Sequence, residues 1–89
     1  MRVAWSPAAL ADVGRIYDYV ARFNPPAARR LAQRLHEVAD ELEHFPHRGR
    51  PAEQGWRELT VARPYVLVYE IRTEEVRILR VWHGAQDRT

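Results

Sequence analysis

The chain has 89 residues, of which 46% are hydrophobic and 29% charged, and it contains no cysteine. This length predicts one domain over residues 1–89, and the composition is typical of a globular protein with one modest core. The absence of cysteine excludes a disulfide framework and a thiolate metal site. No stretch resembles a signal peptide or a membrane span, so we expect a cytoplasmic protein without a membrane partner.

All fourteen basic residues are arginine, although the net charge is only +2. The planar guanidinium binds carboxylate and phosphate groups in bidentate fashion, so it suits protein partners and nucleic acid alike. The codon preference of a GC-rich genome explains the same arginine content, and composition alone favours this explanation.

The first half of the chain predicts a short strand and two helices. Residues 2–5 are of strand type, and Ser6-Pro7 and Asn24-Pro25 both combine a capping side chain with proline at the first helical position. The first helix extends to about Arg22, and the second has about 20 residues. Their apolar stripes comprise Leu10, Val13, Tyr17 and Val20, widened by Ile16 and Phe23, and then Ala28, Leu31, Leu35, Val38, Leu42 and Phe45. Two such helices joined by a short turn predict an antiparallel hairpin.

The second half predicts a loop over residues 45–55 and strands over 56–62, 64–71 and 75–83. In the first of these strands Leu59 and Val61 share one face, while Glu58 and Thr60 share the solvent side. The last two are richer in apolar residues, which is typical of central strands covered on both sides. The order β-α-α-β-β-β predicts an α+β domain with the helical hairpin on one face of an antiparallel sheet.

Few residues outside the last strand suggest chemistry. His36, His44 and His47 lack the further ligands that zinc requires, so we interpret them as exposed and expect neither metal nor cofactor. Tyr65 and Tyr69 share a strand face and could stack RNA bases, although strand propensity favours ordinary tyrosines with hydroxyls at the wet edge. Glu58 is a possible general base on the solvent side of its strand.

The remaining candidate site consists of Arg57, Arg80 and His83. Adjacent antiparallel strands can bring these side chains together on one open face. Such a patch could bind phosphate and serve acid–base chemistry, or it could bind a carboxylate-rich partner. Spacing alone leaves both readings open.

The chain resembles the RelE/ParE superfamily of bacterial type II toxin–antitoxin systems, and within it the ParE branch. The resemblance covers essentially the whole chain, in the segments WSPAALADVGRIYDYV, NPPAARRLAQRL, ELEHFPHRGRP before WREL, YVLVYEI and ILRVWHGAQD. It implies a helical hairpin packed on a curved antiparallel sheet, in agreement with the element order.

The resemblance implies two kinds of activity. RelE-like toxins are ribosome-dependent endoribonucleases that cut mRNA with basic residues and a terminal tyrosine or histidine. ParE-like toxins instead poison DNA gyrase and have no recognised nuclease site. A cognate antitoxin, whose C-terminal segment wraps around the toxin, neutralises both kinds.

This sequence departs from the nuclease pattern at two places. Tyr65 and Val66 stand where nucleases carry an arginine, and PAEQG offers no lysine before the following strand. Without cations nothing stabilises the charge that develops on phosphate. His83 matches the histidine of one nuclease subgroup, but ParE-like chains also carry it in the phrase HGxxD. We therefore interpret His83 as a structural or interface residue.

These observations favour a ParE-like, non-enzymatic gyrase inhibitor that an antitoxin neutralises, with no direct binding to nucleic acid. The alternatives are a RelE-like nuclease that uses His83 with Arg57 and Arg80, and a degenerate toxin that only binds antitoxin. We expect an acidic and apolar antitoxin segment to lie along the helical hairpin and reach the sheet. Its expected contacts there are Trp56, Arg57, Arg80, Trp82 and His83.

Overall fold

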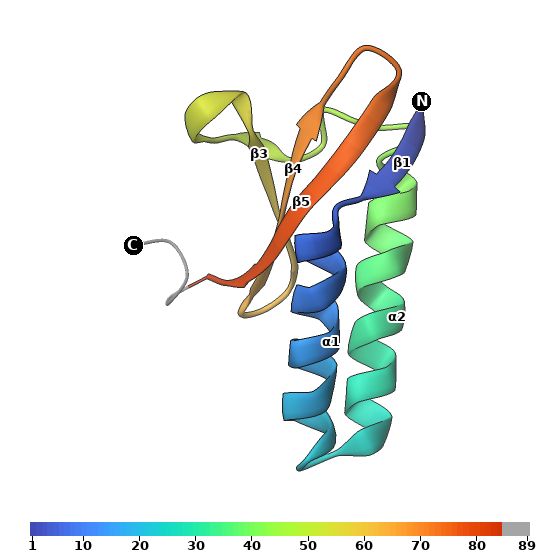
Figure 1. The fold of residues 1–89 in the computed structure, drawn as a ribbon, viewed down its shortest axis with the longest axis vertical. Coiled ribbons are helices and arrows are strands. Elements are labelled where there is room, and N and C mark those ends of the chain that lie inside the picture. Colours follow the sequence, from blue (N-terminus) through green and yellow to red (C-terminus); the bar gives the residue numbers. More distant parts are fainter. Residues whose placement is uncertain (85–89) are drawn as a thin grey trace.

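The computed structural model describes residues 1–84, which form a helical hairpin packed on one face of a five-stranded sheet (Figure 1). The predicted α+β class is therefore confirmed, and every predicted element is present, but the structure adds one short strand to the predicted order. The elements are β1 (Arg2–Trp5), α1 (Pro7–Ala21), α2 (Pro25–Glu41), β2 (Arg50–Pro51), a 3₁₀ turn η1 (Glu53–Gly55), β3 (Arg57–Ala62), β4 (Tyr65–Ile71) and β5 (Glu75–His83).

Both helices begin where the sequence predicts. The Ser6 hydroxyl accepts a hydrogen bond from the Ala9 amide at 3.0 Å, and the Asn24 side chain accepts one from Ala27 at 3.1 Å. Proline follows each cap, where the missing N–H would have had no partner within the helix. The Ser6 hydroxyl also donates to the Leu79 carbonyl at 2.9 Å, so the start of α1 is fixed to β5.

α2 ends earlier than its apolar pattern predicts. The last helical residue is Glu41, and the Leu42 amide already donates to the Ala39 carbonyl three residues back. Leu42 is fully buried, but the Phe45 side chain is 66% exposed, so its assignment to the apolar stripe was wrong. Pro46 disfavours a helical conformation at the residue before it, which accounts for the early end.

The sheet is mixed, with strand order β1-β5-β4-β3-β2. β5, β4 and β3 pair antiparallel, as predicted, and β2 pairs antiparallel with β3. β1 instead pairs with β5 in parallel, in the register Arg2–Glu75 to Trp5–Ile78. The hairpin carries the chain from β1 at one edge of the sheet to β2 at the other. Nothing in the pattern of residues 2–5 indicates that β1 pairs in parallel. β2 is a short strand within the predicted loop.

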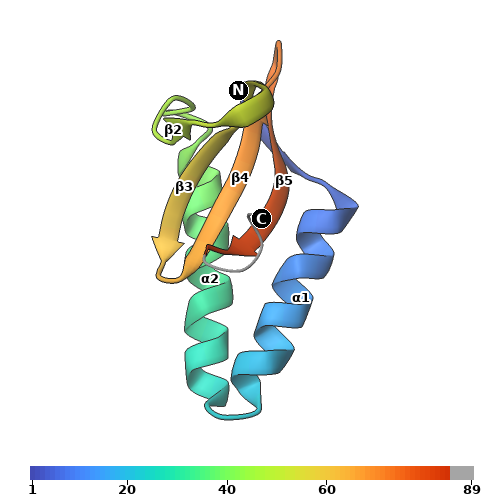
Figure 2. The same ribbon diagram turned by 90° about the vertical axis from the view of Figure 1, so that its left-hand side faces the viewer.

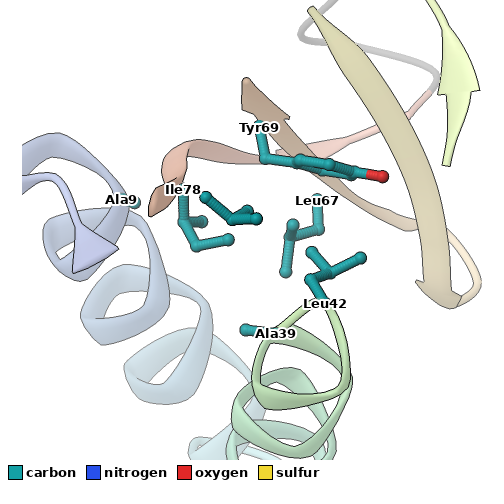
Figure 3. Close-up of a cluster of buried hydrophobic side chains, with 7 residues drawn as sticks. Ala9, Ala39, Leu42, Leu67, Tyr69 and Ile78 are labelled. Carbon is teal, nitrogen blue, oxygen red and sulfur yellow. The ribbon is translucent and has the colours of Figure 1, made fainter. Parts of the chain in front are cut away.

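The core lies between the hairpin and one face of the sheet (Figure 3). Ala9 contributes from α1, and Ala39 and Leu42 from α2. Leu67, Tyr69, Val76 and Ile78 contribute from the sheet. The two helical alanines are small, so the helix backbones can approach the strands closely.

Three further predicted burial states were wrong. Leu10 is 51% exposed and Phe23 is 75% exposed, because Ala9 and Asp12 occupy the centre of the buried face of α1 instead. Glu58 was placed on the solvent side of its strand, but only 8% of it is exposed. β4 does carry buried residues on both faces, from Val66 to Tyr69, whereas residues along β5 alternate between buried and half-buried.

Candidate functional site

A buried carboxylate connects α1 to the part of β5 that extends beyond β1. Asp12 is 2% exposed and accepts hydrogen bonds from Nε and Nη2 of Arg80, at 2.8 and 3.0 Å. It also accepts the Val81 amide at 2.9 Å and forms an ion pair with Arg15. β1 pairs with β5 only as far as Ile78, so Asp12 bonds to backbone on the edge of β5 that β1 leaves uncovered.

The electrostatics of Asp12 favour its ionised form. Burial alone raises the pKa of this carboxyl group, but the hydrogen bonds from Arg80 and Val81, together with the charges of both arginines, outweigh it. The net effect lowers the pKa below its ordinary value. Asp12 is therefore a carboxylate at neutral pH, and much of the charge of Arg80 is compensated within the protein.

Beside this ion pair, a groove runs between α1 and the ends of β4 and β5. It consists of two adjoining cavities of about 330 and 510 Å³, which share Arg15, Ile16, Tyr65 and His83. The first cavity also has Asp12, Arg80, Val81 and Trp82 in its wall, and the second has Tyr19 and Pro64. The α1 residues that line the groove are spaced three and four apart, so they share one face of the helix.

His83 lies at the sheet side of this groove. Its ring contacts Tyr65 on the neighbouring strand edge to face, with 5.8 Å between ring centres. Burial raises the pKa of Tyr65, with a smaller contribution from Tyr19. The Gly84 amide donates to the Pro64 carbonyl at 2.7 Å, and a Cβ on Gly84 would lie 3.1 Å from that oxygen. The glycine after His83 therefore lets the strand end close to the β3–β4 turn.

The prediction that three residues converge on one open face was wrong for Arg57, whereas Arg80 and His83 do line the same cavity. Arg57 is paired with Tyr69, whose ring lies in the core, whereas Arg80 is paired with Val68, the preceding residue of β4. Successive residues of a strand point to opposite faces, so the two arginines belong to opposite faces of the sheet. His83 is paired with Tyr65, on the same face as Tyr69 but at the other end of β4. A β-bulge between Ile78 and Arg80 shifts the register of β5 by one residue, so these two residues point to opposite faces of the sheet.

Arg57 instead holds the loop before β2. Its Nη1 donates a hydrogen bond to the Gly49 carbonyl at 2.7 Å. The Tyr69 hydroxyl binds the same loop: it accepts a hydrogen bond from the Gly49 amide at 2.8 Å and donates one to the Pro46 carbonyl at 2.7 Å. Tyr69 is fully buried, so its predicted wet-edge hydroxyl was wrong, and it cannot stack on RNA in this fold. Burial raises the pKa of this phenol.

The two tryptophans predicted as anchors are both half-buried. Trp82 precedes His83 on β5, and the guanidinium of Arg80 lies 5.8 Å from the centre of its ring. Trp56 precedes β3, where its carbonyl accepts the Ala52 amide at 2.8 Å. Among residues 1–84, no group of three or more histidine, aspartate or glutamate side chains could hold a metal ion. No helix in the same range is long and apolar enough to cross a membrane.

Sequence reasoning missed Asp12 and Arg15. A signal for Asp12 was present, since it lies three residues after Ala9 and four before Ile16, within the apolar spacing of α1. A carboxylate at such a position requires partners from another element, because an isolated charge is costly to bury. The sequence does not identify Arg80 as the partner of Asp12, because α1 lies beside β5 only as a result of the parallel β1–β5 pairing.

Comparison with known proteins agrees with this architecture. The family model described as the ParE toxin of type II toxin–antitoxin systems, parDE, matches residues 3–88. Among curated proteins, the chain is 45% identical over 85 residues to "Toxin RelE2" of Caulobacter vibrioides, covering 96% of this chain and 97% of that one.

Two solved structures combine a similar fold with detectable sequence identity. One is a chromosomal ParDE system from P. aeruginosa, with a TM-score of 0.84, 31% identity and coverage of 93% of this chain and 95% of the other. The other is the RelBE2 complex from Mycobacterium tuberculosis, with a TM-score of 0.69, 28% identity and coverage of 92% and 95%. The chain therefore belongs to the ParE toxin family, within the RelE/ParE superfamily of type II toxin–antitoxin toxins.

Proposed function

We propose that this toxin arrests growth by binding DNA gyrase, without cutting RNA. The observation that carries the proposal is that both candidate arginines already bind groups of the protein itself. Arg80 binds the Asp12 carboxylate, and Arg57 binds the Gly49 carbonyl. RNA cleavage requires cations directed at the charge that develops on phosphate. Inhibition by binding requires only a folded surface. The match to the ParE family model supports the same reading.

Gyrase supercoiling in the presence of purified toxin tests this proposal. Relaxed plasmid, gyrase and ATP should yield progressively less supercoiled product as toxin is added. Toxin that has first been mixed with its antitoxin is the matched control and should leave supercoiling intact. Full supercoiling at excess toxin, with growth still arrested in cells, would exclude gyrase as the target.

A ribosome-dependent nuclease is the second candidate. Its support is the cavity that brings His83, Arg80 and Arg15 together beside Tyr65. A general acid or base typically contributes a factor of about 10²–10⁴ to the rate, so a nuclease with the His83→Ala change should lose that much mRNA cleavage on programmed ribosomes. His44→Ala is the control, because the His44 side chain is 75% exposed and lies far along the chain from the groove. A chain that binds antitoxin but does not arrest growth would instead be a degenerate toxin.

We further propose that the cognate antitoxin docks an acidic and apolar segment in the groove between α1 and β5. The structures from P. aeruginosa and M. tuberculosis are of toxin–antitoxin systems, which supports a partner of this kind. The groove offers Ile16, Tyr19 and Tyr65 to apolar side chains and Arg15 to a carboxylate. Arg15 keeps 66% of its side chain exposed despite its ion pair with Asp12.

A further inference from the structure

The tip of the helical hairpin, residues 19–30, projects beyond the end of the sheet (Figure 2). It carries two strongly exposed aromatic side chains, Phe23 at 75% and Tyr19 at 58%. Their rings meet edge to face with 5.5 Å between centres. Aromatic side chains that are this exposed do not pack in the core, and they are typical anchors of binding surfaces.

The same tip is cationic. Arg22, Arg29 and Arg30 are exposed, and within residues 1–84 no ion pair or side-chain hydrogen bond joins them to another residue. The tip, residues 19–30, contains these three arginines and no acid, whereas residues 35–43 contain four acids and no arginine. Positive charge is therefore concentrated at the projecting end of the hairpin, where it is available to an acidic partner.

The backbone at the tip offers no site for a small anion. Pro25 and Pro26 have no N–H to donate, the Ala27 amide binds the Asn24 side chain at 3.1 Å, and the Ala28 amide binds the Asn24 carbonyl at 3.1 Å. The backbone donors that normally let a helix N-terminus bind phosphate are thus absent or occupied. Recognition at the tip has to come from side chains.

We propose that this tip is the contact through which the toxin engages its target, and that it inserts into a concave protein surface with an apolar floor and an acidic rim. The inference rests on the proposal that the toxin acts by binding a macromolecule. Phe23 and Tyr19 require an apolar pocket, which a phosphate backbone does not offer, and the arginines require carboxylates around it. Tyr19 also lines the groove, so an antitoxin bound there covers one of the two aromatic rings.

Two tip variants, Phe23→Ala and the double variant Arg29→Gln/Arg30→Gln, test the proposal. Both should require at least a tenfold higher toxin level to arrest growth, while antitoxin affinity and melting temperature remain those of the parent. Phe45→Ala and Arg63→Gln are the matched controls, since both residues are exposed and lie outside the tip. Both controls should arrest growth at the dose of the parent.

Tip variants that arrest growth at the dose of the parent would overturn the proposal. So would tight binding of the parent to a fluorescent 20-base-pair DNA duplex that both variants lose, because the tip would then be a nucleic-acid surface. If the parent leaves gyrase supercoiling unaffected while the tip variants still fail to arrest growth, gyrase is excluded and the tip contact is supported. A parent that never arrests growth overturns the tip contact and the toxin activity together.

Discussion

The carboxylate of Asp12 binds the guanidinium of Arg80, 68 positions further along the chain, through two hydrogen bonds of 2.8 and 3.0 Å. Together with the Val81 amide, this contact fixes the middle of α1 to the uncovered edge of β5. The groove lies directly beside it, so the stability of the fold and the shape of the candidate binding site depend on the same side chain.

Replacing Asp12 with alanine should lower the free energy of unfolding by about 3 kcal/mol. This value is at the lower end of the usual cost of breaking a buried ion pair, because 40% of the Arg80 side chain is exposed. Asp12→Asn keeps an acceptor for the Val81 amide and should be less damaging. Urea denaturation of the two variants and the parent measures the difference, and equal stability of all three would show that the ion pair contributes nothing.

The stability of the protein should fall in acid partly through Asp12. The pKa of this group is lower in the folded protein than its ordinary value, so its contribution is complete above the pKa of the unfolded chain, about 3.9. The contribution is lost as the pH falls through the lower folded value. The stability gap between the parent and Asp12→Asn should therefore narrow below about pH 4 in urea denaturation series. A gap that stays constant down to pH 2 would contradict the lowered pKa.

The contact between Gly49 and Tyr69 should tolerate little change. A Cβ on Gly49 would lie 2.7 Å from the Tyr69 hydroxyl and 2.9 Å from the Glu58 carbonyl, so Gly49→Ala should destabilise the fold. Tyr69→Phe leaves the Gly49 amide and the Pro46 carbonyl without their partner, at a cost of about 1–3 kcal/mol. Gly14→Ala is the control, because nothing lies within 4 Å of a Cβ there and alanine favours the helix by about 1 kcal/mol.

Antitoxin affinity should depend on the side chains around the groove. Truncation of Trp82 or Arg80 should weaken binding by about 2 kcal/mol or more, whereas Arg29→Ala should have little effect. Arg80→Ala should also lower the free energy of unfolding, because it leaves the buried Asp12 carboxylate without its main partner. Arg57→Ala should mainly lower the free energy of unfolding, because its guanidinium holds the Gly49 carbonyl. Calorimetry at two salt concentrations, with the melting temperature of each variant, separates the two effects. Parent-like affinity of the Trp82 and Arg80 variants would place the antitoxin elsewhere.

The sequence predicted those features that depend on local signals. Ser6-Pro7 and Asn24-Pro25 placed both helix starts correctly because capping is decided within a few residues. The strand over 75–83 was predicted with its observed bounds, since its run of apolar residues ends at Trp82 and a glycine follows His83. Family resemblance supported the same order of elements over the whole chain.

The candidate site was less predictable because it depends on pairing across the sheet. Arg57 and Arg80 appeared equivalent in the sequence, and only the strand register places them on opposite faces. The buried state of Glu58 likewise contradicts the alternation that its neighbours suggested. Asp12 could be recognised as unusual, but its partner could not, since the parallel direction of β1 leaves no local signal.

The parallel pairing of β1 with β5 also has a consequence for the order in which the protein can fold during synthesis. Arg2 and Glu75 are paired although 73 positions separate them, so the first strand to leave the ribosome waits for the last strand described. Until β5 emerges, Ala9 and Asp12 lack their sheet partners, and the apolar side of the hairpin remains open to solvent. Such long-range contacts slow folding and prolong the exposure of apolar surface. The sheet of this fold therefore cannot be completed until β5, the last strand described, is available to pair with β1.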